Sequence, residues 1–573
     1  MSQKETSPRS DARYTPSGTA NATIIALVER RRGVKSDKLR STMDRSLSKR
    51  VVVAESFAEQ GLAILREAGI TVDSMVGRSR EDLKASLGTA DGLIVRSETR
   101  VDRDLLAAGP RLTVVARAGV GVDSIDVPAA TDAGVVVLNT PAANTLSAVE
   151  LTFGLMISLA RHIPQAVQSL RDGRWDRLKL VGTELAGKTL GIVGLGRIGG
   201  NVASRARAFG MHVQTHDPYI AAARADVFDT KLVDLETLLR TSDIVTLHVP
   251  LNSETRGMID LEKLRLMQKH AFIINCARGG VIVEDALLAA LDEGTIAGAA
   301  IDVVAVEPPP PDGIGAKLHQ HPKLIATPHL GGSTTEALAR IANELAEDVA
   351  RVLLGAPGMG AVNAPVPDGP EADRVLPFLD VAYRMGRFFP QFASGDARGS
   401  YAMQLQGDLI AIPPEAFVRA FLSGLLQTTT DRRVSIVNAE SIAAELGVRV
   451  EARPDPSPTP FAGALRITGG SMTVTGTSVN GSPRIVEAGG FEIDAPPMGD
   501  MLVTQHHDVP GMIGRVGTML GDAKVNISTM QVSRNAIGGD AIMVLGIDRP
   551  ADDATLNALR AIPGVHSVRS LSL

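Results

Sequence analysis

One glycine-rich segment constrains the fold of this chain more than any other. The segment TLGIVGLGRIG places a short apolar run, beginning at Thr189, before the pattern Gly-Leu-Gly-Arg-Ile-Gly. Helix-forming residues follow, so the pattern predicts a strand, a tight turn and the start of a helix. Gly194 permits the turn, Gly196 lets the backbone approach a pyrophosphate, and Gly199 allows the helix to pack closely on the strand. The segment therefore predicts a phosphate-binding turn.

A carboxylate completes this signature. The next apolar strand, 212–216, ends in Asp217, where a carboxylate can accept hydrogen bonds from the hydroxyls of an adenosine ribose. An acidic residue at this position favours NAD over NADP as the cofactor. The structural alternative is a glycine-rich surface turn that binds nothing.

Composition excludes several classes of protein. At roughly 150 residues per domain, 573 residues suggest about four domains, and 44% hydrophobic with 21% charged residues is typical of a globular protein. The net charge of −5 gives no general attraction to nucleic acid. The longest apolar run, 151–160, is about half the length that spans a bilayer, so no membrane partner is expected. We predict no metal site.

Two features bear on location. The single cysteine, Cys276, excludes an internal disulfide and suits a reducing compartment such as the cytoplasm. Residues 1–49 lack early helix or strand periodicity and mix Ser, Thr and Arg with few acids. We expect a disordered extension or an upstream start codon, with Met43 as the initiator; a transit peptide for organellar import remains open.

From Arg50 onward, short strands alternate with helices, which predicts doubly wound parallel sheets. The strands expected in a first unit are 51–56, 70–75, 92–97, 112–118 and 135–140, with helices at 58–68, 81–87 and 102–108. One long buried helix is expected from Asn144 to Asp172. The strands expected in a second, Rossmann unit are 189–194, 212–217, 244–249, 271–277, 297–304 and 324–329. A helix over 334–354 is expected to return to the first unit.

The last 200 residues change pattern twice. A Pro- and Gly-rich linker at 356–370 precedes a mixed α+β region, 371–495, with a strand at 401–405, a helix at 414–426 and a hairpin turning at Asn480-Gly481. A separator at 492–499 then leads into a βαββαβ order, which predicts a small ferredoxin-like module.

Three polar residues follow consecutive predicted strands of the second unit: Arg278, Glu307 and His329. Hydride transfer from a hydroxy acid needs a base for the hydroxyl proton, a cation for the carboxylate and an acid that tunes the base. We assign these roles to His329, Arg278 and Glu307 respectively, with Glu307 raising the pKa of the imidazole. Each has a structural alternative, because single polar residues at strand ends are often loop, capping or surface residues.

Six motifs together resemble the D-isomer-specific 2-hydroxyacid dehydrogenases over residues 50–355. They are GLGRIG at 194–199, Asp217, HVPL at 248–251, NCARGG at 275–280, DVVAVEP at 302–308 and TPHLGG at 327–332. The resemblance implies Arg278, Glu307 and His329 as the catalytic residues. It implies NAD contacts, besides the three glycines, from Arg197, Ile198, Asp217, Pro250, Cys276 and Asp302, with Asp302 near the nicotinamide carboxamide.

Within that family the chain resembles the long-form D-3-phosphoglycerate dehydrogenases. The motif IVRS makes Arg96, with Ser97, the expected phosphate ligand, because a guanidinium fork matches phosphate geometry. A solvated strand end is the alternative for Arg96, and Arg161 is a weaker candidate. The loop containing Gly119, Val120 and Gly121 resembles the segment that binds the substrate carboxylate through backbone amides.

The tail resembles an ACT domain, a ligand-sensing module of amino-acid pathways. The segment DVPG followed by Asn526-Ile527 matches its ligand loop and next strand, which implies His506, Asp508 and Asn526 as serine ligands. A purely structural module is the alternative. The implied domains are a substrate-binding domain (50–147 with 330–355), an NAD-binding domain (148–329), an intervening domain (356–498) and an ACT domain (499–573).

The resemblance implies NAD-dependent oxidation of D-3-phosphoglycerate to 3-phosphohydroxypyruvate, the first step of L-serine biosynthesis, with L-serine as effector. It also implies a homotetramer with dimer contacts through the NAD-binding domain. One alternative is the same chemistry on hydroxypyruvate, glyoxylate or 2-oxoglutarate. The other is an NAD-sensing corepressor-type protein, which the ACT-like tail and the absence of basic character disfavour.

Overall fold

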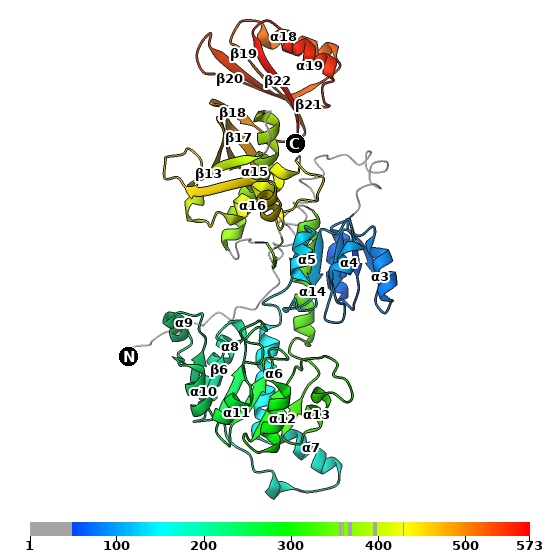
Figure 1. Cartoon of the computed structure of the whole chain (residues 1–573), viewed down its shortest axis with the longest axis vertical. Coiled ribbons are helices and arrows are strands. Elements are labelled where there is room, and N and C mark those ends of the chain that lie inside the picture. The colour runs from blue at the N-terminus through cyan, green and yellow to red at the C-terminus, as the bar shows by residue number, and fades with distance from the viewer. Residues whose placement is uncertain (1–48, 355–357, 359, 365–369, 394–397, 428) are drawn as a thin grey trace, which may run out of the picture.

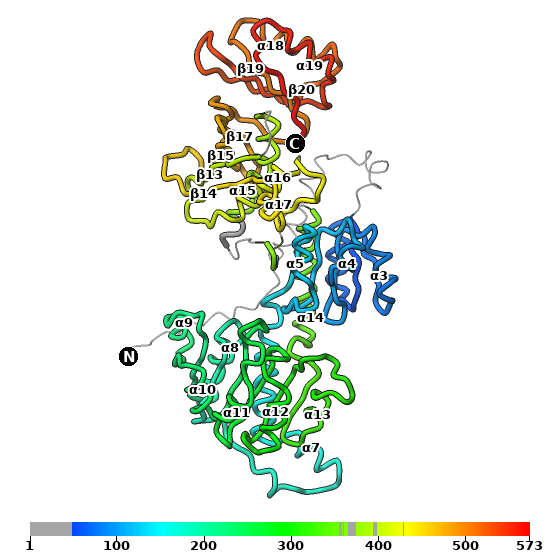
Figure 2. The backbone as a smooth tube through the Cα atoms, in the orientation of Figure 1, coloured from blue at the N-terminus to red at the C-terminus, as the bar shows by residue number. Residues whose placement is uncertain are grey.

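The computed structural model describes residues 49–573 apart from 355–357, 359, 365–369, 394–397 and 428. Apart from Lys49, the predicted N-terminal extension lies outside the described residues, as does much of the predicted linker. Four sheets are stacked along the long axis of the molecule (Figure 1). The Rossmann sheet stands at one end, followed by the first, third and fourth sheets, and the tube in Figure 2 shows α14 (Thr335–Leu353) passing between the first two.

The first sheet is parallel throughout, as predicted. Its strands, in the spatial order β2-β1-β3-β4-β5, are β1 (Arg50–Val53), β2 (Thr71–Ser74), β3 (Gly92–Val95), β4 (Val114–Arg117) and β5 (Val136–Leu138). The helices α3 (Arg80–Leu87), α4 (Arg103–Ala107) and α5 (Val127–Asp132) cover one face. The other face packs on α2 (Glu59–Glu67) and α14, which buries Ile341, Leu345 and Val349 in the same core as Val51. The predicted return of α14 to the first unit is confirmed.

The second sheet has seven parallel strands in the order β12-β11-β10-β9-β6-β7-β8. They are β6 (Thr189–Val193), β7 (His212–His216), β8 (Lys231–Leu232), β9 (Ile244–Leu247), β10 (Phe272–Asn275), β11 (Gly298–Ile301) and β12 (Leu324–Ala326). The prediction of six strands missed β8, because two exposed residues carry no apolar run. Its helices are α8 (Arg197–Ala208), α9 (Ala222–Val227), α10 (Leu235–Thr241), α11 (Leu261–Leu266), α12 (Glu284–Asp292) and α13 (Ile314–Gln320). The strand order reverses between β6 and β9, so a ligand site is expected at their carboxyl ends.

The single long helix predicted over 144–172 is wrong. The segment forms α6 (Thr145–Ala160) and α7 (Ile163–Arg171), which meet at an angle of 63° around His162, a residue with φ +53°. Pro164 explains the break, since its ring would meet the carbonyl of Ala160 in a continuous helix. That carbonyl instead accepts a hydrogen bond from the N–H of Thr183. Neither half alone has the length and apolar character to cross a membrane, and the same holds for every other single helix that is described; the bent pair meets that test only together.

The third sheet is mixed and has six strands in the order β14-β13-β15-β16-β17-β18. They are β13 (Gly399–Gly407), β14 (Val448–Pro454), β15 (Gly463–Gly469), β16 (Met472–Val479), β17 (Ser482–Ala488) and β18 (Phe491–Ala495). The hairpin predicted at Asn480-Gly481 joins β16 to β17, and both turn residues have positive φ, as a two-residue turn of this kind requires. The helices are α15 (Pro370–Ala393), α16 (Glu415–Leu426) and α17 (Ala439–Glu445).

The tail has the βαββαβ order that the sequence predicts. Its elements are β19 (Asp500–His507), α18 (Met512–Asp522), β20 (Ile527–Arg534), β21 (Asp540–Ile547), α19 (Asp553–Arg560) and β22 (Val565–Ser572), with the strand order β20-β21-β19-β22. The separator predicted at 492–499 is shorter than expected, because its first four residues belong to β18. The strand alternates buried and exposed residues through Ala495, and Pro496-Pro497 ends it.

The third and fourth sheets share one hydrophobic core, which we call the shared core. The side chains of Met501, Val503, Ile542 and Val544 in the fourth sheet are buried together with Phe388 and other apolar residues of α15. Polar contacts reinforce the junction, since Ser572 accepts hydrogen bonds through its carbonyl from Arg387 and Gln391 of α15. The tail is therefore packed onto the third region and does not hang from it on a linker.

Candidate active site

The glycine turn between β6 and α8 is built for close approach. Gly194 has φ +93°, and a Cβ there would lie 2.6 Å from the carbonyl oxygen of His248. A Cβ on Gly199 would lie 2.0 Å from the carbonyl oxygen of Gly194, so only glycine lets α8 pack this closely. Gly196 faces open space, with no atom within 4 Å of a Cβ at that position. The amino end of α8 thus offers N–H groups and a positive dipole to an anion.

Asp217 fastens this turn to the end of β7. Its Oδ2 accepts a hydrogen bond of 2.9 Å from the N–H of Leu195, and its Oδ1 accepts one of 3.0 Å from the N–H of Tyr219. Arg197 opens α8 with an exposed side chain, and Ile198 packs half-buried against the core beneath the sheet. These residues fit the phosphates and adenosine ribose of a dinucleotide.

The other predicted cofactor residues follow β9, β10 and β11 on the same edge. Pro250 is exposed after β9. Cys276 is buried after β10, and burial raises the pKa of its thiol to about 12, so it is a packing residue and no nucleophile at neutral pH.

Asp302, after β11, holds the loop that carries His329. Its buried carboxylate accepts hydrogen bonds from the hydroxyl of Thr327, the N–H of Leu330 at 2.7 Å and the N–H of Gly331 at 2.8 Å. The N–H of His329 itself donates to the carbonyl of Asp302 at 2.9 Å. The structure thereby gives Asp302 a positioning role that the sequence did not indicate.

His329 and Glu307 form a close pair. The imidazole Nδ1 lies 2.6 Å from Glu307 Oε2, while the Glu307 Oε1 accepts a hydrogen bond of 3.2 Å from the N–H of Val304. Burial acts to raise the pKa of Glu307, but the hydrogen bond and charge of His329 outweigh it, and the pKa lies below its ordinary value. Glu307 is therefore ionised at neutral pH and accepts from Nδ1, which leaves Nε2 free to exchange a proton.

Arg278 reaches across to the first unit. Asn275 shapes its turn, donating from its side-chain amide to the Arg278 carbonyl at 2.9 Å and accepting from the N–H of Ala277 at 3.0 Å. The Arg278 Nε lies 3.2 Å from Asp123 Oδ2, in the loop that follows β4. A Cβ on Gly121 would lie 2.2 Å from Arg278 Nη2 and 2.5 Å from Asp123 Oδ2, so a larger residue there would displace this pair of side chains. The charge of Arg278 also helps to lower the pKa of Glu307, so Arg278 lies within electrostatic range of the pair formed by Glu307 and His329.

The loop after β4 is held by its carbonyl groups. The Gly119 carbonyl accepts from the N–H of Thr140 at 3.0 Å, and the Val120 carbonyl accepts from the Asn139 side chain at 2.5 Å. Gly119 has φ +143°, a conformation that favours glycine. The N–H groups of Val120 and Gly121 meet no acceptor in the described part of the chain, so they are available to an anionic ligand.

Arg96 and Ser97 follow β3 on the same edge of the first sheet. Glu55 orders this turn by accepting from the N–H of Arg96 at 2.9 Å, and the Arg96 guanidinium donates to Ser56 Oγ at 3.1 Å. The Ser97 side chain is exposed. Arg161, the weaker candidate, lies elsewhere: it follows Ala160, which lines a cavity with Lys188 and Asp243 at the amino ends of the Rossmann strands.

Sequence reasoning missed Arg117, the last residue of β4. Its side chain is half-buried and donates from Nη1 to the carbonyl of Ala118 at 3.4 Å, while the buried Nε has no hydrogen-bond partner among the described residues. Arg117 lies within electrostatic range of Arg96 and Arg278. Burial, with the charge of Arg278, lowers the pKa of Arg117 to about 10, which still leaves it protonated at neutral pH. The signal was available, since Arg117 ends a strand of mostly buried residues two positions before Gly119, the first glycine of the loop that follows.

The predicted effector residues do not come together within one chain. Asp508 follows β19 and accepts from Arg534 Nη1 at 2.8 Å, whereas Asn526 precedes β20 and donates its N–H to Asp548 at 3.0 Å. Since β19 and β20 both run antiparallel to β21, these residues lie at opposite ends of the sheet. His506 is buried, which lowers the pKa of its imidazole, and its Nδ1 lies 3.3 Å from Thr504 Oγ1.

Three family models match the chain. The NAD-binding domain of D-isomer specific 2-hydroxyacid dehydrogenases matches residues 153–331, the D-3-phosphoglycerate dehydrogenase intervening domain matches 374–488, and the ACT domain matches 501–564.

Relatives match nearly end to end. D-3-phosphoglycerate dehydrogenase of Bacillus subtilis is 41% identical over 91% of this chain and 99% of its own length. The protein of the same name from Methanocaldococcus jannaschii is 39% identical over 91% and 100%. Among solved structures, the TT0316 protein of Thermus thermophilus covers 55% of this chain and 99% of its own, with 35% identity and a TM-score of 0.51. A glyoxylate reductase of Paecilomyes thermophila covers 55% and 98%, with 28% identity and a TM-score of 0.50.

Proposed function

This chain belongs to the D-3-phosphoglycerate dehydrogenases, a branch of the D-isomer-specific 2-hydroxyacid dehydrogenases, and we propose that it oxidises D-3-phosphoglycerate to 3-phosphohydroxypyruvate with NAD. The observation that carries this proposal is a series of three cations: Arg278 acts on Glu307 of the His329 pair, and Arg117 lies within electrostatic range of both Arg278 and Arg96. A substrate with a carboxylate at one end and a phosphate at the other needs cations for both groups near the catalytic base. The reaction opens the route to L-serine.

The base and its partner act on the C2 hydroxyl of the substrate. The glycine turn and Asp217 would hold NAD, which would supply the acceptor for the hydride of C2. His329 Nε2 takes the hydroxyl proton, and the Glu307 carboxylate at Nδ1 stabilises the imidazolium that results. Arg278, oriented by Asn275 and Asp123, binds the substrate carboxylate and polarises the developing carbonyl. The free N–H groups of Val120 and Gly121 bind the carboxylate from the other side.

Arg96 and Arg117 bind the phosphate of the substrate. Arg117 carries the stronger geometric argument, because its buried Nε lacks a partner within the ranges that the structure describes and an anion would supply one. Arg96 is also half-buried, and its guanidinium donates a hydrogen bond to Ser56 Oγ. Ser97, exposed beside it, can donate to the same phosphate.

The test of the proposed function is NADH oxidation with 3-phosphohydroxypyruvate against hydroxypyruvate, glyoxylate and 2-oxoglutarate. We expect a strong preference for the phosphorylated substrate. Arg96→Ala should raise KM for it about 10- to 100-fold, the cost of one charge-assisted hydrogen bond, and leave the unphosphorylated acids unaffected. Arg103→Ala, which removes an exposed arginine paired with Asp132 in the same sheet unit, is the matched control.

Two results would overturn parts of this assignment. Equal rates across the panel make the chain a general 2-hydroxyacid dehydrogenase and remove the role of Arg96. Tight NADH binding without turnover of any 2-oxoacid would instead favour an NAD-sensing protein.

We propose L-serine as the effector, bound between two copies of the chain. Asp508 suits an ammonium group and Asn526 a carboxylate, yet they lie at opposite ends of one sheet. A ligand that touches both must therefore bridge two copies. The burial of His506 makes it a support behind the loop more than a ligand.

For the effector site, Asp508→Ala and Asn526→Ala should each raise the serine concentration for half-inhibition by about 10-fold or more, since each removes a hydrogen bond to a charged group. Activity without serine should be retained, because both residues are remote from the cleft. Asp553→Ala, at the exposed start of α19, serves as the control. Inhibition that survives both substitutions places the effector elsewhere.

We propose a homotetramer with dimer contacts through the NAD-binding unit. Residues 163–183, which we call the arm, project from the end of this unit (Figure 1) and expose apolar side chains. Trp175, Leu178 and Val181 are 82%, 90% and 76% exposed, an arrangement typical of a surface that another subunit covers.

Charges on the arm should dissociate this interface. Trp175→Glu with Leu178→Glu removes two anchor side chains, and a loss of about 2 kcal/mol or more weakens the contact at least about 30-fold. Light scattering after size-exclusion chromatography should then show a smaller assembly than the tetramer. Val76→Glu, an exposed apolar residue of the first unit, is the control. An unchanged mass in the arm variant contradicts the proposed contact.

The domain boundaries at 147/148, 329/330, 355/356 and 498/499 are also proposed. The ends of the sheets and the ranges of the family models support them. A cytoplasmic location is proposed on the strength of the single buried cysteine. One relative, D-3-phosphoglycerate dehydrogenase 2 of Arabidopsis thaliana, is chloroplastic by name.

A further inference from the structure

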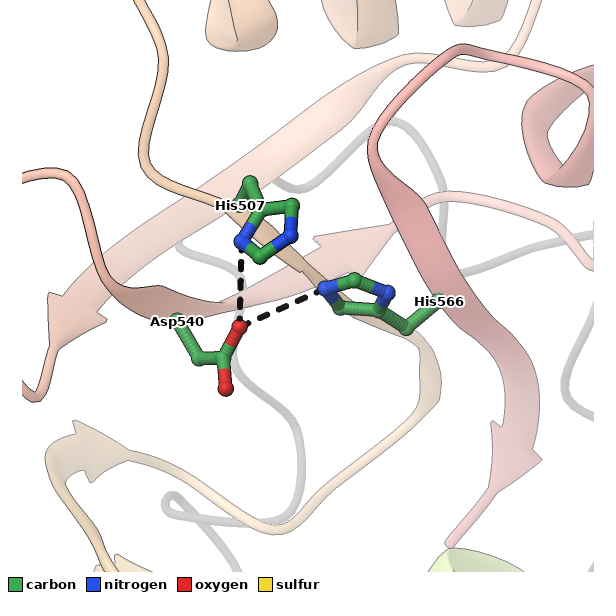
Figure 3. A group of neighbouring side chains, drawn as sticks. All are labelled: His507, Asp540 and His566. Atoms are coloured by element: carbon green, nitrogen blue, oxygen red, sulfur yellow. Dashed lines mark ion pairs between the residues drawn. The ribbon is translucent and has the colours of Figure 1, made fainter.

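Two histidines and an aspartate converge at one end of the fourth sheet (Figure 3). The Nδ1 of His507 lies 3.2 Å from the Oδ1 of Asp540, and the Nε2 of His566 lies 3.3 Å from the same oxygen. All three donor atoms lie within 4.8 Å of one another. The side chains of His507, Asp540 and His566 are 55%, 52% and 46% exposed, so an ion can reach them from solvent.

The fold brings these residues together from three strands. His507 ends β19 and is paired directly with Asp540, the first residue of β21, so both side chains share one face of the sheet. On β22 the register skips one residue: Gln505 pairs with Ser567, whereas His506 pairs with Val565. His566 is the skipped residue. In a regular ladder His566 would oppose the buried His506, and the bulge turns it toward His507 instead.

The donor set and its spacing suit a transition-metal ion. Imidazole nitrogens with one carboxylate oxygen are ligands for zinc and its neighbours, while magnesium and calcium prefer oxygen alone. With metal–ligand distances of about 2.0 to 2.1 Å, two ligands of a tetrahedral ion lie about 3.3 Å apart. The two distances to Asp540 already have this value. Only the two imidazoles have to approach one another.

We propose that His507 Nδ1, Asp540 and His566 Nε2 bind a divalent ion of the zinc class, with water completing the coordination. The site lies outside the catalytic cleft and does not depend on the proposed reaction.

An ion there would fix the neighbourhood of Asp508. The N–H of Asp508 donates to the carbonyl of Gly539 at 2.8 Å, so the residues that follow His507 and precede Asp540 are joined. The Asp508 carboxylate also accepts from the N–H of Gly538 at 3.3 Å. Ligation on both sides of this junction would lock the ends of β19 and β21 together.

The proposal is tested by titrating the full-length protein with Zn²⁺ by calorimetry and with Co²⁺ by visible absorption. We compare the wild type with His566→Ala, Asp540→Asn and a control, His319→Ala, which removes an exposed histidine of α13. Asp540→Asn keeps the size of the side chain but removes its charge, so it separates ligation from packing. Circular dichroism confirms that each variant is folded.

We expect the wild type and His319→Ala to bind one more Zn²⁺ per chain than His566→Ala. Loss of a direct ligand should weaken this binding at least about 100-fold, since removal of outer partners alone costs 10- to 100-fold. The Co²⁺ complex should show the intense visible bands of a tetrahedral ion, and these should disappear in His566→Ala and Asp540→Asn. Equal stoichiometry and affinity in the wild type and His566→Ala, or no binding by the wild type, would overturn the proposal.

Discussion

Replacing His329 with asparagine should lower kcat by about 10²- to 10⁴-fold, the range that a positioned general base contributes. Asparagine is the appropriate replacement because His329 has φ +55°, a conformation that asparagine tolerates. The loop should keep its shape, since Asp302 holds it through the backbone of Leu330 and Gly331 and not through the imidazole. Steady-state rates and NADH affinity, measured on the same preparation, check both statements.

The companion variant is Glu307→Gln. Glu307 has a lowered pKa, so its charge is present at neutral pH and is lost only as the pH falls through that lowered value. The glutamine variant lacks the charge at every pH, and its kcat should fall less than in His329→Asn because the base remains. A His329→Asn enzyme with kcat within about threefold of the wild type would show that another group takes the proton. His319→Asn controls for a surface histidine on the same unit.

Replacing Ile542 with aspartate should unfold the third and fourth sheets together. Ile542 is fully buried in the shared core, and a buried unpaired charge costs about 4 kcal/mol or more. The core includes residues of α15 as well as of β19 and β21, so damage on one side removes packing on the other. Hydrogen exchange should show loss of protection in β13–β18 as well as β19–β22, while the Rossmann sheet keeps its protection.

Ser528→Asp is the control for this variant, because it adds the same charge at an exposed position of the same sheet. Loss of protection confined to β19–β22 in Ile542→Asp would mean that the third region is stable alone. The third region would then fold without the shared core, which would be only a contact between two independently stable regions.

The parallel sheets were predictable because most of their strands are short apolar runs followed by glycine or a polar residue. The Rossmann turn, Asp217, and the strand ends carrying Arg278, Glu307 and His329 followed from that pattern. Strand β8 was missed for want of an apolar run, and the helices that were misjudged contain proline. Pro164 breaks the helix expected over 144–172, whereas α15 continues through Pro377 and Pro390, which locally indicate an end.

The parts of the site that could not be predicted from the sequence depend on contacts between distant residues. The position of Arg117 at a strand end was visible in the sequence, but its approach to Arg96 and Arg278 was not, because that approach depends on how three loops meet. The separation of Asp508 from Asn526 likewise depends on strand order, which local pattern does not contain. The approach of Asp123 to Arg278 joins residues 155 positions apart.

The return of α14 to the first sheet has a consequence during synthesis. The last strand of that sheet ends at Leu138, but the helix that covers one of its faces ends at Leu353. At 5 to 20 residues per second, the ribosome needs about 10 to 40 s to cover this interval. Until then Val51, Val114 and Leu138 lack the helix that buries them. The last Rossmann strand, β12, ends at Ala326 and is synthesised before α14. The nascent chain therefore completes its second unit before its first. The uncovered face of the first sheet is the apolar surface that stays available to chaperones for the longest time.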